Sequence, residues 1–499
     1  MAARALMVQG SSSSVGKSLL VAALCRYFAR RGVRVAPFKA QNMSNNAAVC
    51  ADGAEIGRAQ ALQALAAGVA PSAEMNPILL KPEGDARAQV VVMGRPWRTL
   101  SAGAYAQHKA ALWATVTAAL DALRARYELV LIEGAGSPAE LNLRASDLAN
   151  MAVARYAQAP VLLVGDIDRG GIFAQLLGTL WLLPPAERAL VRALVVNKFR
   201  GDPALFAEGV RQLEAASALP VLGVLPWLGD LGLPEEDAVA LETPPPPAPA
   251  GPAALDLAVI QLPHIANFDD FTPLAAEDGV RLRYVRTCAA LGQPHAVLLP
   301  GTKSTVADLL WLRRQGLARA IVHLARSGTA VVGICGGYQM LGERLDDPAG
   351  VESPRPSVVG LGLLPVCTQF AGDKATYQVR AQVCGGPGWL AALRGQEVSG
   401  YEIHMGRTAS PRPWLKVHRA GAAAPIADGA TDATGRIWGC YLHGLFANPG
   451  LRRAWLASLG WKGRAAAAEV DVTARLDALA DWVAAGLDLR RLEALVWGS

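Results

Sequence analysis

The sequence predicts an α/β protein with two successive open sheets, in which short apolar strands alternate with helices. Three observations favour this fold class. Apolar runs that suit buried strands recur along the chain, a phosphate-loop pattern follows the first run at residues 10–18, and a glycine–cysteine–glycine turn follows another at residues 333–337. In open α/β sheets, ligands bind beyond the carboxyl ends of the strands, so polar motifs in these places indicate functional sites.

Composition bounds the class of protein. The 499 residues, 52% of them hydrophobic, are enough for two or three domains with proper cores. The seven cysteines include no C-x-x-C pair, which argues against a disulfide framework or zinc site and favours a reducing, cytoplasmic setting. No signal peptide or membrane span is expected. The net charge of +6 is dispersed, so anionic small molecules fit better than nucleic acid.

The first expected strand, residues 5–9, leads into the loop Gly10-Ser-Ser-Ser-Ser-Val-Gly16-Lys17-Ser18 and then a helical pattern. In such a loop, backbone N–H groups wrap phosphates, Lys17 reaches the terminal ones and the Ser18 hydroxyl can ligate magnesium. Five residues separate Gly10 from Gly16, one more than the strict Walker pattern. The alternative is a flexible serine-rich turn, which Gly-Lys-Ser at the opening of a helix argues against.

Further strands are expected to end in polar residues. Residues 33–38 lead to Lys39 and an amide-rich loop, and residues 128–132 lead to Glu133 and a run of small residues. Beside a nucleotide loop, a strand-end carboxylate suits a magnesium ligand, although alone it would more often be an ordinary loop acid. Residues 194–196 lead to Asn197, in a polar cluster that could read a nucleobase or hold phosphate.

A proline-rich stretch at residues 243–252 is the clearest boundary in the chain, because a proline run joins neither sheet nor helix. We therefore expect a first domain at residues 1–240, a linker at 241–252, a second domain at 253–447 and a helical tail at 448–499. Apolar spacing places one face of an amphipathic tail helix at Leu476, Leu479, Trp482, Val483 and Leu487.

The second domain carries a candidate nucleophile. Gly333, Cys335 and Gly337 form G-x-C-x-G between a buried strand and a helix, the thiol counterpart of the nucleophile elbow. The start of the helix should stabilise the thiolate. The alternative is a buried core cysteine. A nucleophilic thiol needs a base, and the best candidate is His443, which lies 108 residues further on at the end of another apolar run.

A nucleotide site and a thiol nucleophile in one chain suggest glutamine-dependent amidation. The thiolate would attack the side-chain amide of glutamine and release ammonia. The ATP site would meanwhile convert an inert carboxylate into an acyl phosphate that ammonia can attack.

Twelve stretches carry a specific resemblance: PFKAQNMSNN, EIGRAQALQA, MNPILLKP, IEGAGSPAELNLR, DLANM, VGDIDRGGIFA, NKFRGD, LPHIANFDDFTPL, LPGTKST, VGICGGYQMLG, GYEIHMG and YLHGLF. With these motifs, from residue 8 to about 446, the chain resembles the cobyric acid synthase family of cobalamin biosynthesis. The first domain is similar to dethiobiotin synthetase, whose phosphate loop has the same extra residue. The second is similar to class I (triad) glutamine amidotransferases.

The resemblance implies ATP- and glutamine-dependent amidation of the b, d, e and g carboxylates of adenosylcobyrinic acid a,c-diamide, a corrinoid polycarboxylate. Cys335 would be the nucleophile and His443 the general base and acid. In the first domain, Lys17 and Ser18 would hold phosphate and Mg²⁺, and Lys39 would contact phosphate. Asp52 and Glu133 would complete the metal site.

Two departures leave questions open. Many triad amidotransferases carry His-x-Glu, but residue 445 is Leu, so the group that orients His443 is not identified. Ser14 stands where an acid is expected in many relatives' phosphate loops. His404 could make a structural hydrogen bond or contact substrate.

Other functions stay possible. The sister amidotransferase that forms the a,c-diamide has the same domain order. A nucleotide-switched partition or regulatory ATPase shares the first domain's fold, but leaves Cys335 and His443 without a role. CTP synthase is similar in order, yet its His-x-Glu is missing here. The order of the amidations, the corrin-binding residues, the ammonia path and the oligomeric state are not predicted.

Overall fold

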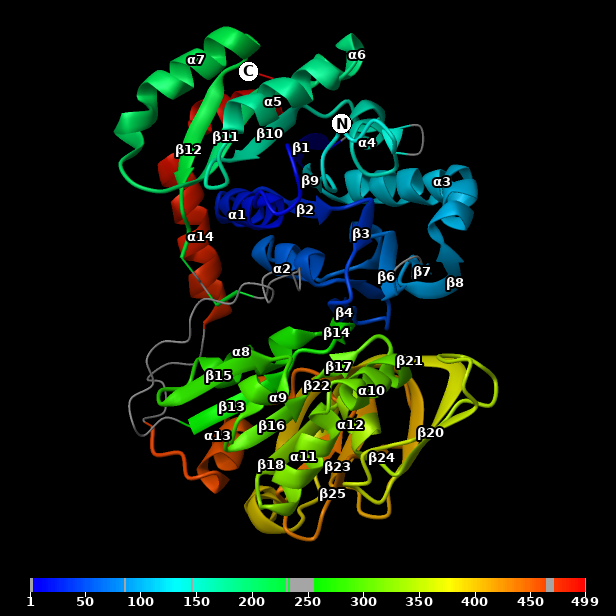
Figure 1. Ribbon diagram of the computed structural model, residues 1–499. Helices are drawn as coiled ribbons and strands as arrows, with labels where there is room; N and C mark the ends of the chain where they lie inside the picture. Colours follow the sequence, from blue (N-terminus) through cyan, green and yellow to red (C-terminus); the bar gives the residue numbers. More distant parts are fainter. Residues whose placement is uncertain are drawn as a thin grey trace.

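The computed structural model describes residues 3–84, 87–144, 147–229, 232–233, 255–463 and 471–498. It has two α/β halves, one above the other in Figure 1, and each half contains a six-stranded sheet that is mainly parallel. This confirms the predicted fold class. The expected linker at 241–252 lies outside the described residues.

The sheet of the first half is parallel throughout, in the order β12-β11-β10-β1-β9-β2. Its strands are β1 (Arg4–Gly10), β2 (Val35–Phe38), β9 (Leu129–Glu133), β10 (Val161–Asp166), β11 (Val191–Phe199) and β12 (Val221–Pro226). The central strands β1, β9 and β10 are apolar along nearly their whole length because helices cover both faces of the sheet. Their carboxyl ends bring Gly10, Glu133 and Asp166 to one edge.

Successive residues of β1 feed two cores, as the period of a strand requires. Ala5 and Met7 pack with one set of helices, α3 (Ala102–Arg126), α4 (Met151–Ala157) and α5 (Ile172–Leu182). Leu6 and Val8 pack with α1 (Lys17–Arg30) on the other face. The remaining helices of this half are α2 (Arg58–Ala66), α6 (Pro185–Arg188) and α7 (Ala207–Ser217).

A small sheet is inserted between β2 and β9. Its order is β3-β6-β7-β8, and its strands are β3 (Gln41–Met43), β6 (Ile78–Gly84), β7 (Arg87–Val92) and β8 (Arg95–Ser101). A hairpin of β4 (Ala47–Val49) and β5 (Glu55–Gly57) accompanies it. The amide-rich segment after residue 38 is thus partly a strand and not only a loop.

The second half has a main sheet in the order β15-β13-β16-β18-β26-β25, parallel except for β25. Its strands are β13 (Leu255–Ile260), β15 (Val280–Val285), β16 (Ala296–Leu299), β18 (Ala330–Ile334), β25 (Ala430–Thr431) and β26 (Ile437–Cys440). β18 and β26 are neighbours, so the segments that follow them, with Cys335 and His443, emerge side by side.

A second sheet beside it contains β19 (Arg344–Asp346), β20 (Ser357–Val359), β21 (Cys367–Val383), β22 (Glu397–Ala409), β23 (Leu415–Arg419) and β24 (Ile426–Asp428). β14 (Ile265–Ala266) pairs with β17 (Gly301–Thr302). The helices of this half before residue 447 are α8 (Thr272–Ala275), α9 (Cys288–Leu291), α10 (Thr305–Arg314), α11 (Leu317–Arg326) and α12 (Gly336–Leu341).

The C-terminal segment divides between the two halves. α13 (Pro449–Ser458) packs into the second core through Leu451, Trp455 and Leu456. α14 (Val472–Gly486) and α15 (Leu489–Trp497) return to the first half, where α14 lies beside α1 in Figure 1. The predicted apolar face of α14 is confirmed, because Leu476, Leu479 and Val483 are buried against α1.

The halves meet through the inserted sheet and hairpin of the first half. Asn46 and Asn267 exchange hydrogen bonds with the backbone across the boundary: Ala47 N donates to Asn267 Oδ1 at 2.9 Å and Asn267 N to Asn46 Oδ1 at 2.6 Å. Lys303 and Glu83 form an ion pair across it at 2.7 Å. No helix among the described residues is long and apolar enough to cross a membrane.

Candidate active sites

The phosphate loop is a tight turn between β1 and α1. Gly16 has φ 98°, and a Cβ there would lie 2.3 Å from Nδ2 of Asn197, so only glycine fits. Nζ of Lys17 donates to the backbone oxygens of Ser12 and Gly136, each at 3.0 Å. The loop therefore closes around the lysine despite its extra residue.

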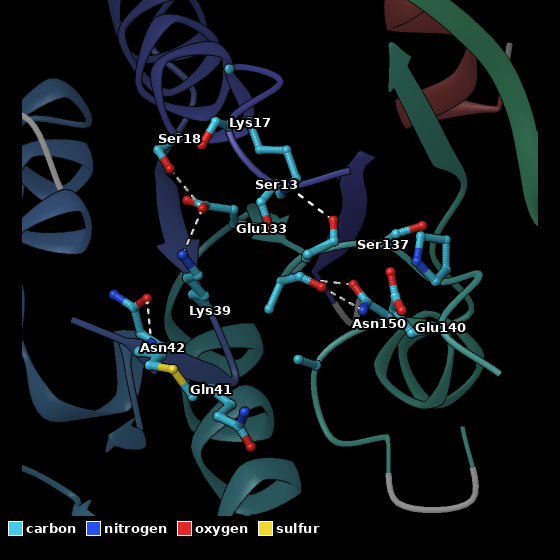
Figure 2. Close-up of a pocket in the computed structure, with 18 of the residues that line it drawn as sticks. Ser13, Lys17, Ser18, Lys39, Gln41, Asn42, Glu133, Ser137, Glu140 and Asn150 are labelled. Carbon is cyan, nitrogen blue, oxygen red and sulfur yellow. Dashed lines mark hydrogen bonds and ion pairs between the residues drawn. The ribbon is translucent and has the colours of Figure 1, made fainter. Parts of the chain in front are cut away.

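Glu133 is the centre of a buried polar cluster at the end of β9. Its Oε1 accepts hydrogen bonds from Oγ of Ser18 and Nζ of Lys39, each at 2.8 Å, and Figure 2 shows both side chains directed at it. Its Oε2 accepts from Nε2 of Gln63 at 2.6 Å. Burial alone would raise the pKa of Glu133, but Lys39 and these hydrogen bonds hold it below its usual value. The carboxyl group is therefore ionised.

A cavity of about 1440 Å³ opens beside this cluster. Lys17, Ser18, Lys39 and Glu133 all line it. Apolar side chains also line it from several elements, and some are well exposed: Leu19, Met43, Leu141 and Leu143. The space exceeds that of an ordinary small-ligand pocket, so it can admit a nucleotide together with a second large molecule.

Asn197 supports the phosphate loop as well as lining the cavity. Its Nδ2 donates to the backbone oxygen of Val15 at 2.8 Å. The next residue, Lys198, donates to the backbone oxygen of Ser14 at 2.7 Å and pairs with Asp166 at 2.9 Å. Lys198 therefore contacts Ser14, the residue that stands where an acid was expected in many relatives.

Asp52 does not belong to this cluster. It is exposed in the turn between β4 and β5, where its Oδ1 accepts from the backbone N of Ala54 at 3.0 Å. An aspartate followed by glycine is typical of such a turn. Asp52 does not line the cavity, so the structure does not bring it to Ser18 and Glu133 as expected.

The donor set fits a magnesium–nucleotide complex. A hydroxyl and an ionised carboxylate, Ser18 and Glu133, are hard oxygen ligands of the kind that Mg²⁺ prefers. Lys17 and Lys39 are buried cations beside them, which suit phosphate. The ion would supply charge neutralisation of the phosphates at this place.

Cys335 occupies a strained turn at the end of β18. Its φ is 51°, a region that a side chain rarely adopts, and α12 begins at the next residue. The turn depends on its small neighbours, because a Cβ on Gly337 would lie 2.0 Å from the backbone oxygen of Leu299. This is the predicted elbow geometry, and it holds the thiol at a fixed position.

His443 is held by Asp270. Nδ1 of His443 lies 2.7 Å from Oδ2 of Asp270, and the other carboxylate oxygen accepts from the backbone N of Gly444 at 2.7 Å. Both side chains are buried, with 2% of the His443 side chain and 3% of the Asp270 side chain exposed. A carboxylate on Nδ1 leaves Nε2 of the imidazole for the thiol.

Charge couples His443 to both neighbours. Burial alone would lower the pKa of His443, but the carboxylate of Asp270 and the sulfur of Cys335, which also hydrogen-bonds the imidazole, raise it to about 10. The imidazolium form therefore predominates at neutral pH. It can stabilise a thiolate and later give a proton to a leaving amine.

A small cavity of about 60 Å³ adjoins the thiol, and both halves of the chain line it. Cys335 and His443 come from the second half, and Lys81 and Gln89 from the inserted sheet of the first. The thiol site is therefore complete only where the two halves meet.

Comparisons with known proteins agree with both sites. Residues 6–238 match the family described as "CobQ/CobB/MinD/ParA nucleotide binding domain", and residues 256–451 match "CobB/CobQ-like glutamine amidotransferase domain". A cobyric acid synthase of Chloroflexus aurantiacus is 56% identical over 99% of this chain and 100% of its own. That of Chloroflexus aggregans is 58% identical over 93% of this chain and 93% of its own. That of Moorella thermoacetica is 51% identical over 99% of this chain and 97% of its own.

The chain belongs to the cobyric acid synthase family. As a member of this family it is an amidotransferase of cobalamin biosynthesis with a nucleotide-binding domain, which confirms the predicted family and enzyme class. The partition-ATPase alternative loses its support, because it gives the amidotransferase half no role.

Some residues at the two sites of this cobyric acid synthase family member were not predicted from the sequence. Asp270 lies in the stretch LPHIANFDDFTPL, but two adjacent aspartates offered no sign of which one meets His443. Gln63 lies in the stretch EIGRAQALQA, but nothing in that stretch indicated that its amide meets Glu133. His404 makes a structural contact, since Nδ1 lies 2.8 Å from the backbone oxygen of Gly406, yet it also lines the small cavity beside the thiol.

Proposed function

We propose that this enzyme amidates the b, d, e and g carboxylates of adenosylcobyrinic acid a,c-diamide, with ATP and glutamine as co-substrates and Mg²⁺ as the metal. One observation carries the proposal: a buried Cys335–His443–Asp270 arrangement and a phosphate-loop cavity occur in one chain, and residues of both halves line the small cavity beside the thiol. The names of the relatives support the choice of substrate.

At the thiol site, the sulfur of Cys335 bonds to the amide carbon of glutamine, and His443 gives its proton to the departing ammonia. A water molecule then hydrolyses the thioester and releases glutamate. Asp270 keeps the imidazole in one orientation during both steps.

At the nucleotide site, a substrate carboxylate oxygen attacks the terminal phosphorus of ATP and ADP leaves. Lys17 and Lys39 would hold the phosphates, and Ser18 and Glu133 the metal. Ammonia then attacks the acyl phosphate and phosphate departs. Each amidation thus consumes one ATP, one glutamine and one water.

The large cavity has exposed apolar side chains, such as Leu141 and Leu143. Binding of a nucleotide alone does not require them, so they favour a macrocyclic substrate in the same cavity. Mass spectrometry of the corrinoid after incubation with enzyme, ATP, Mg²⁺ and glutamine tests the proposal. We expect four additional amides on the a,c-diamide. Two amides on unamidated cobyrinic acid, with none on the a,c-diamide, would instead assign the sister reaction.

A further inference from the structure

One short helix contacts the surroundings of both sites. α2 has nine residues, which spans roughly 13 Å, and in Figure 1 it lies between α1 and the second half. Its first residue, Arg58, reaches across the boundary, and two later residues, Gln60 and Gln63, face Glu133.

Arg58, the first residue of α2, binds Asp269 and Tyr401, which lie next to Asp270 and the catalytic His443. The guanidinium of Arg58 pairs with Oδ2 of Asp269 at 3.0 Å and hydrogen-bonds the hydroxyl of Tyr401. Asp269 directly precedes Asp270, which accepts from His443. Only 16% of the Arg58 side chain is exposed, so few other positions are open to it.

Tyr401 transmits this contact to His443 in two ways. The two rings are stacked, with centroids 5.2 Å apart and planes 18° apart. Their backbones also exchange hydrogen bonds, Tyr401 N to His443 O at 3.1 Å and His443 N to Tyr401 O at 2.9 Å. A displacement of Arg58 would therefore act on His443 through the ring of Tyr401, or through Asp269 and the adjoining residue Asp270 that positions the imidazole.

Further along α2, two glutamine side chains contact Glu133 of the nucleotide site. Nε2 of Gln63 donates to Oε2 of Glu133 at 2.6 Å and to the backbone oxygen of Ser18 at 3.2 Å. Nε2 of Gln60 lies 3.5 Å from the same Oε2. A metal–nucleotide complex that engages the carboxylate of Glu133 competes with these amide groups for its oxygens.

We propose that α2 couples the nucleotide site to the thiol site, and that Arg58 is the positioning residue through which it acts on His443. The inference rests on the proposed function. Occupation of the nucleotide site changes the bonds that Gln60 and Gln63 make to Glu133, and α2 carries the change to Arg58 as a rigid body. Glutamine hydrolysis is thereby fast only when a carboxylate is being activated.

Coupling between binding sites is reciprocal. If nucleotide improves glutamine binding by some factor, occupation of the thiol pocket must tighten nucleotide binding by the same factor. This gives a readout that needs no turnover: the Kd of ATP before and after Cys335 is alkylated by a diazoketone analogue of glutamine. We expect a change of about tenfold in the wild type and none in Arg58→Met.

The kinetic test measures glutaminase activity with and without ATP and corrinoid, and amidation driven by ammonium. We expect nucleotide to raise glutaminase activity about tenfold in the wild type. Arg58→Met should lose this stimulation yet keep ammonium-driven amidation, which does not use the thiol. Gln63→Leu should also lose the stimulation. Arg58→Lys, which retains the charge for Asp269, should restore part of the stimulation.

Glu83→Gln is the matched control, because it breaks the ion pair with Lys303 across the same boundary without touching α2. It should keep the stimulation. The inference is overturned if the wild type is not stimulated, if Arg58→Met and Gln63→Leu remain stimulated, or if Glu83→Gln loses stimulation equally. A wild type without any glutaminase activity would instead refute the proposed function.

Discussion

Asp270 holds the imidazole of His443 through a 2.7 Å contact to Nδ1, although the two residues lie 173 positions apart in the chain. It supplies a carboxylate to His443 although the His-x-Glu pattern is absent from this chain. The thiol site is thus a three-residue arrangement, with its carboxylate supplied from the segment before α8.

The charge of Asp270 helps to determine the pH range over which His443 stays protonated. The pKa of His443 is raised to about 10, so the imidazolium persists throughout the neutral range and is lost as pH rises through that value. Asp270→Asn should lower this pKa, move the alkaline limb of the glutaminase profile to lower pH, and reduce the maximal rate about 100-fold. An unchanged profile in the variant would contradict the contact.

The same shift predicts a stability effect. Because the pKa of His443 is higher in the folded state than its ordinary value of 6.5, its stabilising contribution is complete below about pH 6.5 and declines as pH rises towards 10. The loss of stability between pH 7 and 10, measured by urea unfolding, should be smaller in His443→Gln than in the wild type. Equal losses in both proteins would count against the raised pKa.

The structure separates Glu133 from Asp52, the two carboxylates that the family resemblance assigned to a metal site. Glu133→Gln should reduce ammonium-driven amidation by about 100-fold, because it removes the buried charge beside Ser18 and Lys39. Asp52→Asn is the matched control and should leave the rate within about twofold, since the residue is an exposed turn aspartate. The rates at saturating Mg²⁺ and ATP decide this, and a comparable loss in both variants would restore Asp52 to the site.

Glycine at position 337 is required by the elbow. A Cβ there would lie 2.0 Å from the oxygen of Leu299, so Gly337→Ala should lower the free energy of unfolding by about 1–3 kcal/mol or more. Gly178→Ala in α5 is the control, because nothing lies within 4 Å of its added Cβ. That variant should be neutral or more stable by about 0.5–1 kcal/mol. Thermal unfolding of both proteins tests the contrast, and similar melting temperatures would show that the elbow tolerates the methyl group.

The packing of α14 against α1 should contribute to the stability of the first half. Leu479 is fully buried against α1, so Leu479→Ala should lower the free energy of unfolding by about 2–5 kcal/mol. Leu205→Ala, at a position that is 85% exposed, should change it by less than about 0.5 kcal/mol. Equal effects in denaturant unfolding would mean that the packing of α14 contributes little.

Much of the fold could be predicted because buried parallel strands are continuous apolar runs, as β1, β9 and β18 are. The inserted sheet could not be predicted in the same way. β8 is largely exposed along its length, and the three residues of β3 include two amides, so neither has a buried-strand pattern. Their pairing depends on neighbours distant in the chain.

The site residues also fall into two groups, those that could be predicted from the sequence and those that could not. Lys17, Ser18, Cys335 and His443 could be proposed because each sits in a local pattern with a physical reason. Asp270 and Arg58 could not, since their roles arise from contacts between segments far apart in sequence. Asp52 was assigned to the metal through the family resemblance, whereas its local Asp-Gly turn determines its position.

The central claim, that Cys335 frees ammonia from glutamine for use at the nucleotide site, is tested most directly with glutamine labelled with ¹⁵N in its side-chain amide. Mass spectrometry should find the label in every new corrinoid amide made by the wild type. Cys335→Ala should incorporate none from glutamine, yet form the same amides from ammonium. Labelled amides from Cys335→Ala, or unlabelled amides from the wild type in the absence of added ammonium, would contradict the account.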